Sequence, residues 1–146
     1  MRFEGRRTLP APPLVVWETL LDPLVLRDCI PGCREVRRDG ADYHVRATIR
    51  MLFLRGSYQG RIRLVNPVPP HSFQLDAETA LGVLSAVIRL SGDTATTLVY
   101  HCDGHLEGVL LRFGEPLIRS LANRLLDQYF ACLASSLRRR TALQEP

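Results

Sequence analysis

The sequence predicts an α+β fold: a curved, seven-stranded antiparallel sheet wrapped around one long C-terminal helix, with two short helices after the first strand. Seven segments alternate between apolar and polar residues, the period expected of strands with one buried face. The stretch from Gly114 to Arg140 instead repeats apolar residues every three or four positions, as a helix does. Proline-bounded helical segments lie between the first and second strands.

Length and composition are those of one globular domain. The chain has 146 residues, 46% hydrophobic and 23% charged. We expect a single domain over residues 1–141 and a loose tail at 142–146. No apolar run approaches the ~18 residues that a membrane span needs, and the first residues enter a strand directly, so we expect no secretory signal. These features predict a cytoplasmic location with four reduced cysteines, Cys29, Cys33, Cys102 and Cys132.

The N-terminal elements follow from alternation and prolines. A strand is predicted at Arg2–Leu9, where Arg7 is the one charged residue on the apolar side. Prolines at 10, 12 and 13 end it and begin a helix, which Asp22-Pro23 ends in turn. A second short helix, Leu24–Cys29, precedes Pro31-Gly32.

Six further strands are predicted by period-two alternation between turn signals. They fall at Glu35–Arg38, Tyr43–Met51, Tyr58–Leu64, Phe73–Thr79, Ala86–Leu90 and Leu98–Leu106.

The final helix is predicted from Glu115 to Leu137, with Pro116 in its first turn, where a missing N–H costs nothing. It would be about 35 Å long at 1.5 Å per residue. No other element is long enough to cover the apolar face of the sheet.

A hydrophobic cavity is expected between this helix and the sheet, because small residues such as Ala47, Gly60 and Gly104 do not fill the inner face of a curved sheet. Three tyrosines could place hydroxyls in it, as small-molecule sites require. The alternative is a fully packed core. The predicted ligand-binding residues are Trp17, Ile30, Tyr43, Val45, Ala47, Tyr58, Ile62, Phe73, Leu75, Ala77, Ala86, Ile88, Tyr100, Cys102, Phe113, Ile118, Leu121 and Leu125.

No metal, cofactor or catalytic residue is predicted. His101, Asp103 and His105 share one strand face, but it is the polar face, so we expect cross-strand pairing in solvent rather than a metal site. Cys29 and Cys33 could form a metal or redox pair, although Pro31-Gly32 favours a turn with small buried thiols. No nucleophile elbow, phosphate loop or inward-facing acid is present.

The net charge is +4, and all 19 basic residues are arginines scattered along the chain, which argues against a nucleic-acid partner. Arginines on the outer sheet face should form cross-strand ion pairs, or alternatively a docking surface for an acidic partner. They are Arg46, Arg50, Arg61, Arg63 and Arg89. Arg138–Arg140 either complements the helix dipole or gives at most transient contact with anionic lipid.

A family resemblance spans nearly the whole chain. Its most specific part is Cys29-Ile30-Pro31-Gly32-Cys33, and other parts are Met1–Gly5, Pro10–Pro12, Val16-Trp17, Leu21–Pro23, Gly56–Gly60, Pro69–Phe73 and Asp127–Phe130. Together these resemble the CoxG family of carbon monoxide dehydrogenase, which is part of the START/Bet v 1-like (SRPBCC) superfamily.

The resemblance implies a helix-grip fold with a hydrophobic cavity that binds quinone-like or lipid molecules. It also implies service to a molybdenum hydroxylase of the carbon monoxide dehydrogenase type, peripheral to the inner membrane face. The chain departs from the family pattern at Ala80–Leu84, where members have a glycine-rich segment and where larger side chains bear on access to the cavity. It also lacks the long C-terminal extension of many members, which argues against stable membrane anchoring.

Three functions are therefore weighed. The first is non-catalytic binding of a hydrophobic molecule under the last helix. The second is an enzyme of the polyketide cyclase/dehydratase kind, which would need polar or acidic groups inside the cavity. The third is an interaction or assembly factor that acts through the outer sheet face.

Overall fold

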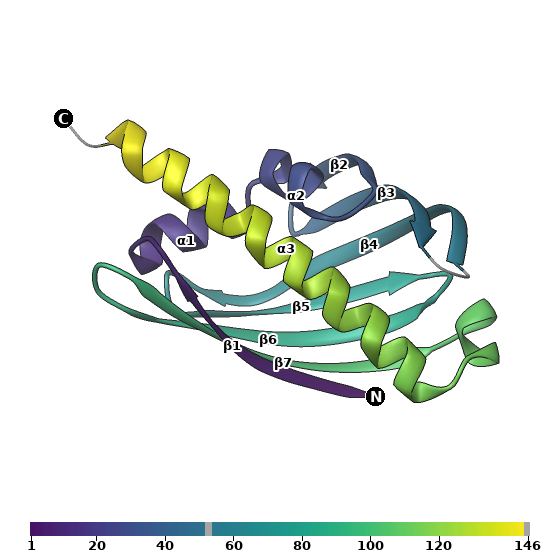
Figure 1. Ribbon diagram of the computed structural model, residues 1–146. Coiled ribbons are helices and arrows are strands. Elements are labelled where there is room, and N and C mark those ends of the chain that lie inside the picture. The colour runs from purple at the N-terminus through teal and green to yellow at the C-terminus, as the bar shows by residue number, and fades with distance from the viewer. Residues whose placement is uncertain (52–53, 145–146) are drawn as a thin grey trace.

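The computed structural model describes residues 1–51 and 54–144 and confirms the predicted α+β helix-grip architecture (Figure 1). In chain order the elements are β1 (Arg2–Leu9), α1 (Pro13–Leu20), α2 (Pro23–Cys29), β2 (Cys33–Asp39), β3 (Asp42–Met51), β4 (Leu54–Val68), β5 (Ser72–Thr79), β6 (Gly82–Gly92), β7 (Thr96–Leu106), the 3₁₀ helix η1 (Gly108–Arg112) and α3 (Glu115–Gln144).

The seven strands form one antiparallel sheet in the order β1-β7-β6-β5-β4-β3-β2. Consecutive strands from β2 to β7 pair as hairpins, and β1 returns to pair with β7, from Arg2 opposite Asp103 to Leu9 opposite Thr96. The sheet curves, and α3 crosses its concave side diagonally (Figure 1). The helices α1 and α2 lie between the C-terminal half of α3 and the sheet edge at β2, and both contact α3.

The core divides into two clusters, one at each end of α3. In its C-terminal half, Phe130, Leu133 and Leu137 are buried against α1, α2 and the sheet. At its N-terminal end, Ile118 and Leu121 pack with Leu110 of η1 in a smaller cluster. The helix is thus fixed at both ends by buried hydrocarbon, while its middle turns are left less tightly covered.

The structure corrects the predicted end of the last helix. The helix continues beyond Leu137 to Gln144, so residues 142–144 of the expected tail are helical, and Glu145 and Pro146 lie outside the described residues. No glycine or proline stands between Leu137 and Glu145 to end it. The domain boundary at 141 stays a prediction.

Because the helix is longer, Arg138–Arg140 is not its last turn. The Arg140 guanidinium instead donates to Asp22 and, at 3.2 Å, to the hydroxyl of Thr19. Asp22 also accepts from the backbone N–H of Leu24 at 2.9 Å, capping α2. Asp22 therefore joins the C-terminal part of α3 to the junction of α1 and α2.

Across residues 1–51 and 54–144, no helix is both long enough and apolar enough to span a membrane.

Replacing a core leucine of α3 tests the packing that fixes the helix. Leu133 is fully buried, so Leu133→Ala should lower the free energy of unfolding by about 3–4 kcal/mol through lost burial and a residual cavity. The measurement is urea denaturation followed by circular dichroism.

The matched control is Leu143→Ala on the same helix, where the leucine is 86% exposed and the expected change is within about 0.5 kcal/mol. Equal losses for the two variants would contradict this description of the core.

Candidate ligand-binding cavity

A large apolar cleft opens beneath the middle of α3. Its volume is about 740 Å³, and it lies between α3, the loop after α2, the inner side of β3 and the ends of β1, β6 and β7. The lining residues are Phe3, Ile30, Pro31, Gly32, Arg34, Ala47, Thr48, Ile49, Arg50, Leu84, Cys102, Ala122, Leu125, Leu126, Gln128 and Tyr129. We call this the outer cavity.

A second, deeper space of about 210 Å³ adjoins it, and its walls are almost entirely hydrocarbon and aromatic. The lining residues of this inner cavity are Leu20, Leu21, Leu26, Ile30, Tyr43, Ile62, Phe73, Leu75, Ile88, Leu98, Tyr100, Cys102, Leu126, Tyr129 and Phe130. Four residues line both spaces, namely Ile30, Cys102, Leu126 and Tyr129, and we call these four the junction. Together the two cavities have the size and character of sites for apolar small molecules.

The sequence builds one wall through the tight turn after α2. Gly32 has a φ of +77°, and a Cβ there would collide with the carbonyl oxygen of Thr48 in β3. The close approach lets the Thr48 N–H donate to the carbonyl of Gly32 at 2.9 Å. Only glycine combines this left-handed conformation with this approach, so Pro31-Gly32 holds Ile30 at the junction.

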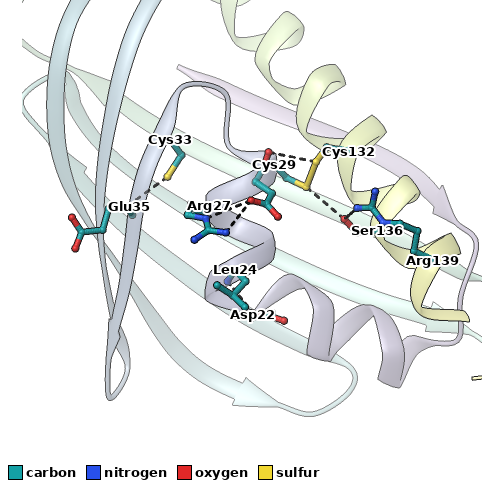
Figure 2. A network of polar contacts seen from close by, with 10 residues as sticks. Asp22, Leu24, Arg27, Cys29, Cys33, Glu35, Cys132, Ser136 and Arg139 are labelled. Atoms are coloured by element: carbon teal, nitrogen blue, oxygen red, sulfur yellow. Dashed lines mark hydrogen bonds and ion pairs between the residues drawn. A yellow bond between two sulfur atoms is a disulfide. The ribbon is translucent and has the colours of Figure 1, made fainter. Parts of the chain in front are cut away.

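A disulfide closes the same wall against α3. Cys29, the last residue of α2, is bonded to Cys132 of α3, with 5.3 Å between their Cα atoms (Figure 2). The expectation of four reduced cysteines is therefore wrong for these two, and Cys29 does not pair with Cys33. Sequence reasoning missed the pair because its members are 103 residues apart, and the helical period alone does not show which side of α3 faces α2.

The remaining thiols are free. Cys33 lies apart from the disulfide in Figure 2 and donates weakly to the carbonyl of Glu35 at 3.6 Å. Cys102 is at the junction. Burial raises the pKa of both thiols, so they are neutral near pH 7.

Ten of the predicted ligand-binding residues lie in the cavity walls. They are Ile30, Tyr43, Ala47, Ile62, Phe73, Leu75, Ile88, Tyr100, Cys102 and Leu125. Their contact with a ligand stays a prediction.

The other eight do not line either cavity, because packing uses them elsewhere. Trp17 packs edge-on against Phe73, with ring centroids 5.1 Å apart, and Ala86 is in the same cluster. The N-terminal cluster takes up Tyr58, Phe113, Ile118 and Leu121. Val45 and Ala77 border separate depressions.

Several lining residues were not predicted. Leu126 belongs to the apolar stripe of the last helix, and Tyr129 follows it by three positions, so the helical period could have indicated both. Leu84, in the segment that departs from the family pattern, lines the mouth and is 38% exposed. Arg34 and Arg50 also line the mouth, although Arg50 was expected on the outer face, and neither forms an ion pair with the described residues.

The three tyrosines expected to present hydroxyls have other contacts. The Tyr43 hydroxyl donates to the carbonyl of Leu21 at 2.7 Å, and that of Tyr58 donates to the carbonyl of Arg55 at 3.4 Å. Tyr100 packs over Gly5, where a Cβ would lie 2.6 Å from its Cζ, and its hydroxyl lies within hydrogen-bond reach of Arg7.

Arg7, the one charged residue on the apolar side of β1, is satisfied at the edge of the core. Its guanidinium donates to Asp127 of α3 at 2.7 Å and lies over the ring of Phe130, 4.8 Å from the centroid. The hydrogen bond to Asp127 raises the pKa of Arg7 above its ordinary value. The pair joins β1 to α3 next to the inner cavity.

The polar strand face behaves as predicted. His101 pairs with Glu4 at 3.3 Å, Arg2 lies 4.0 Å from Asp103, and these side chains are exposed. In the described part of the chain, no three potential metal ligands come together. On the outer face, Arg46, Arg61 and Arg63 form cross-strand ion pairs with Glu35, Glu78 and Asp42.

The chain is similar to known proteins in both sequence and structure. The model of the CoxG family, which is described as a subunit of carbon monoxide dehydrogenase, matches residues 5–138. No curated protein matches the sequence.

Among solved structures, a conserved protein from Geobacillus kaustophilus has a TM-score of 0.85 at 24% identity, over 95% of this chain and 96% of that one. A START superfamily protein from Mycobacterium smegmatis has a TM-score of 0.76 at 11% identity, with 94% and 97% covered. The ZhuI aromatase/cyclase from Streptomyces sp. R1128 has 0.72 at 16%, with 97% and 95% covered. At these identities the similarities show the fold.

The disulfide gives a direct prediction. Because the bond joins residues 103 apart, the double variant Cys29→Ser/Cys132→Ser should lose about 4 kcal/mol of stability, as expected when so long a loop is released. Thiol titration of the denatured, unreduced wild type should find two free thiols.

Cys33→Ser serves as the control and should change stability by less than about 1 kcal/mol. Four titratable thiols in unreduced protein, or equal stability losses in both variants, would be inconsistent with the Cys29–Cys132 bond.

Proposed function

The chain belongs to the CoxG family of carbon monoxide dehydrogenase, and on that premise we propose that it binds a hydrophobic small molecule of the quinone or lipid class without transforming it. The ligand would occupy the outer and inner cavities beneath the middle of α3. The observation that supports this most strongly is the pair of adjoining apolar spaces, about 740 and 210 Å³, at the place where α3 is least covered.

The lining favours binding over proton-transfer catalysis. Among the described residues that line the two cavities, none is a carboxylate or an imidazole. An enzyme of the cyclase/dehydratase kind requires an acid or base within hydrogen-bond reach of its substrate. The charged residues in the lining are Arg34 and Arg50 at the mouth, which are always protonated and serve poorly as proton donors or acceptors.

We further propose that the protein serves a molybdenum hydroxylase of the carbon monoxide dehydrogenase type from a cytoplasmic position, peripheral to the inner membrane face. This rests on the family relationship. The mouth of the outer cavity supports transient contact with a membrane surface, because exposed Leu84 lies there together with two arginines that lack acidic partners in the described residues.

Filling the outer cavity tests the binding function. Ala122 lines the cavity from α3, so Ala122→Trp should lower affinity for a long-chain naphthoquinone by at least about tenfold through loss of space. Native mass spectrometry measures the bound fraction, and the same experiment shows whether the purified wild type retains an apolar molecule.

Ala142→Trp is the matched control on the same helix, outside both cavities, and should bind as wild type does. If wild type neither retains an apolar molecule nor binds the probe, or if both variants bind equally, the proposal is wrong.

Occupancy can also be followed at Cys102. In a Cys33→Ser variant this residue is the one free thiol of those described, and its raised pKa should make alkylation slow at pH 8 and faster as the pH rises, because the thiolate is the nucleophile. A bound naphthoquinone should slow the reaction further, since Cys102 lines both cavities. Alkylation at an unchanged rate in the presence of saturating ligand would contradict binding at this site.

A further inference from the structure

The junction between the two cavities contains one strong hydrogen-bond donor. Ile30 and Leu126 offer hydrocarbon there, and Cys102 offers a thiol, which is a weak donor. Tyr129 is the fourth junction residue, and its phenol is the one group of the four that can donate a normal hydrogen bond. Any molecule that extends from the outer cavity into the inner one passes this side chain.

Tyr129 differs from the other three tyrosines in having its hydroxyl unpaired. The hydroxyls of Tyr43 and Tyr58 donate to backbone carbonyls, and that of Tyr100 is near the Arg7 guanidinium. No hydrogen bond joins the Tyr129 hydroxyl to any residue in the described ranges 1–51 and 54–144, and its ring packs edge-on against Phe130, with centroids 5.4 Å apart. A hydroxyl left unpaired in an apolar wall costs about 1–3 kcal/mol, so such groups are rare unless a ligand or water completes them.

The protonation state suits a donor. Burial raises the pKa of Tyr129 well above its ordinary value, so the hydroxyl keeps its proton throughout the neutral range. The charges nearest the cavities are kept away from the junction, since Arg34 and Arg50 line only the outer cavity and Arg7 is paired with Asp127. A negatively charged ligand group at the junction would therefore be buried without a counter-ion, at high cost, and a neutral oxygen is favoured over a carboxylate or phosphate.

We propose that Tyr129 is a specificity-determining residue that donates a hydrogen bond to a neutral carbonyl oxygen of the ligand at the junction of the two cavities. The ligand class is thereby narrowed to apolar molecules with a carbonyl on a ring or chain, and pure hydrocarbons are bound less well. This inference rests on the proposed function, because it concerns the same cavities.

A matched pair of ligands tests it. One probe is a naphthoquinone methylated at both free quinone carbons, so that it cannot add to thiols, and the other is dimethylnaphthalene, with the same ring skeleton and no oxygen. Affinities are measured for wild type, Tyr129→Phe and the control Tyr43→Phe, whose hydroxyl is already used by Leu21.

Tyr129→Phe should weaken binding of the quinone by about fivefold to tenfold, the value of one neutral hydrogen bond, and leave dimethylnaphthalene unchanged. Tyr43→Phe should leave the ratio of the two affinities as in wild type. If wild type binds both probes but Tyr129→Phe changes them equally or not at all, this inference is wrong while the proposed function stands. If wild type binds neither probe, the proposed function itself fails.

A second measurement applies even if Tyr129→Phe folds poorly. The infrared carbonyl stretch of the quinone bound to wild type should lie below its position in hexane, because hydrogen bonding weakens the C=O bond. A bound quinone with an unshifted carbonyl band would overturn the inference.

Discussion

The structure depends on how α3 is fixed across the curved sheet. Buried hydrocarbon holds it at both ends, with Leu133 and Leu137 in the larger cluster and Ile118 and Leu121 in the smaller one. A straight helix over a curved surface cannot be packed equally along its length, because the surface falls away between the two contacts. The middle of α3, where Ala122 and Leu126 face inward, is where space remains.

Polar and covalent contacts fix the helix at the same depth on either side of that space. Arg140 binds Asp22 and Thr19, Arg7 binds Asp127, and the Cys29–Cys132 disulfide attaches α2 directly to α3. Because these contacts hold the roof and one wall in place, the cavities need not collapse when they are empty. The apolar space is then available for a ligand instead of being filled by side chains.

Most of the fold could be predicted because its signals are local: alternation for the strands, a period of three to four for α3, and prolines at the helix starts. The cavity could be predicted only in outline. Inner-face residues such as Ile62 and Leu75 lie in its wall, but Tyr58 and Ile118 are used in the N-terminal cluster, a choice that depends on where η1 folds back. The disulfide and the unpaired hydroxyl of Tyr129 depend on contacts between residues far apart in sequence or on the rotation of α3, and neither leaves a local pattern.

The central claim is that the space under α3 holds an apolar ligand, and a crystal structure of the protein soaked with the dimethylated naphthoquinone tests it most directly. We predict electron density for the ring system between Ile30 and Leu126, continuous with the outer cavity, with α3 in place. Density on the outer sheet face, or side chains rearranged to fill both cavities, would contradict the account.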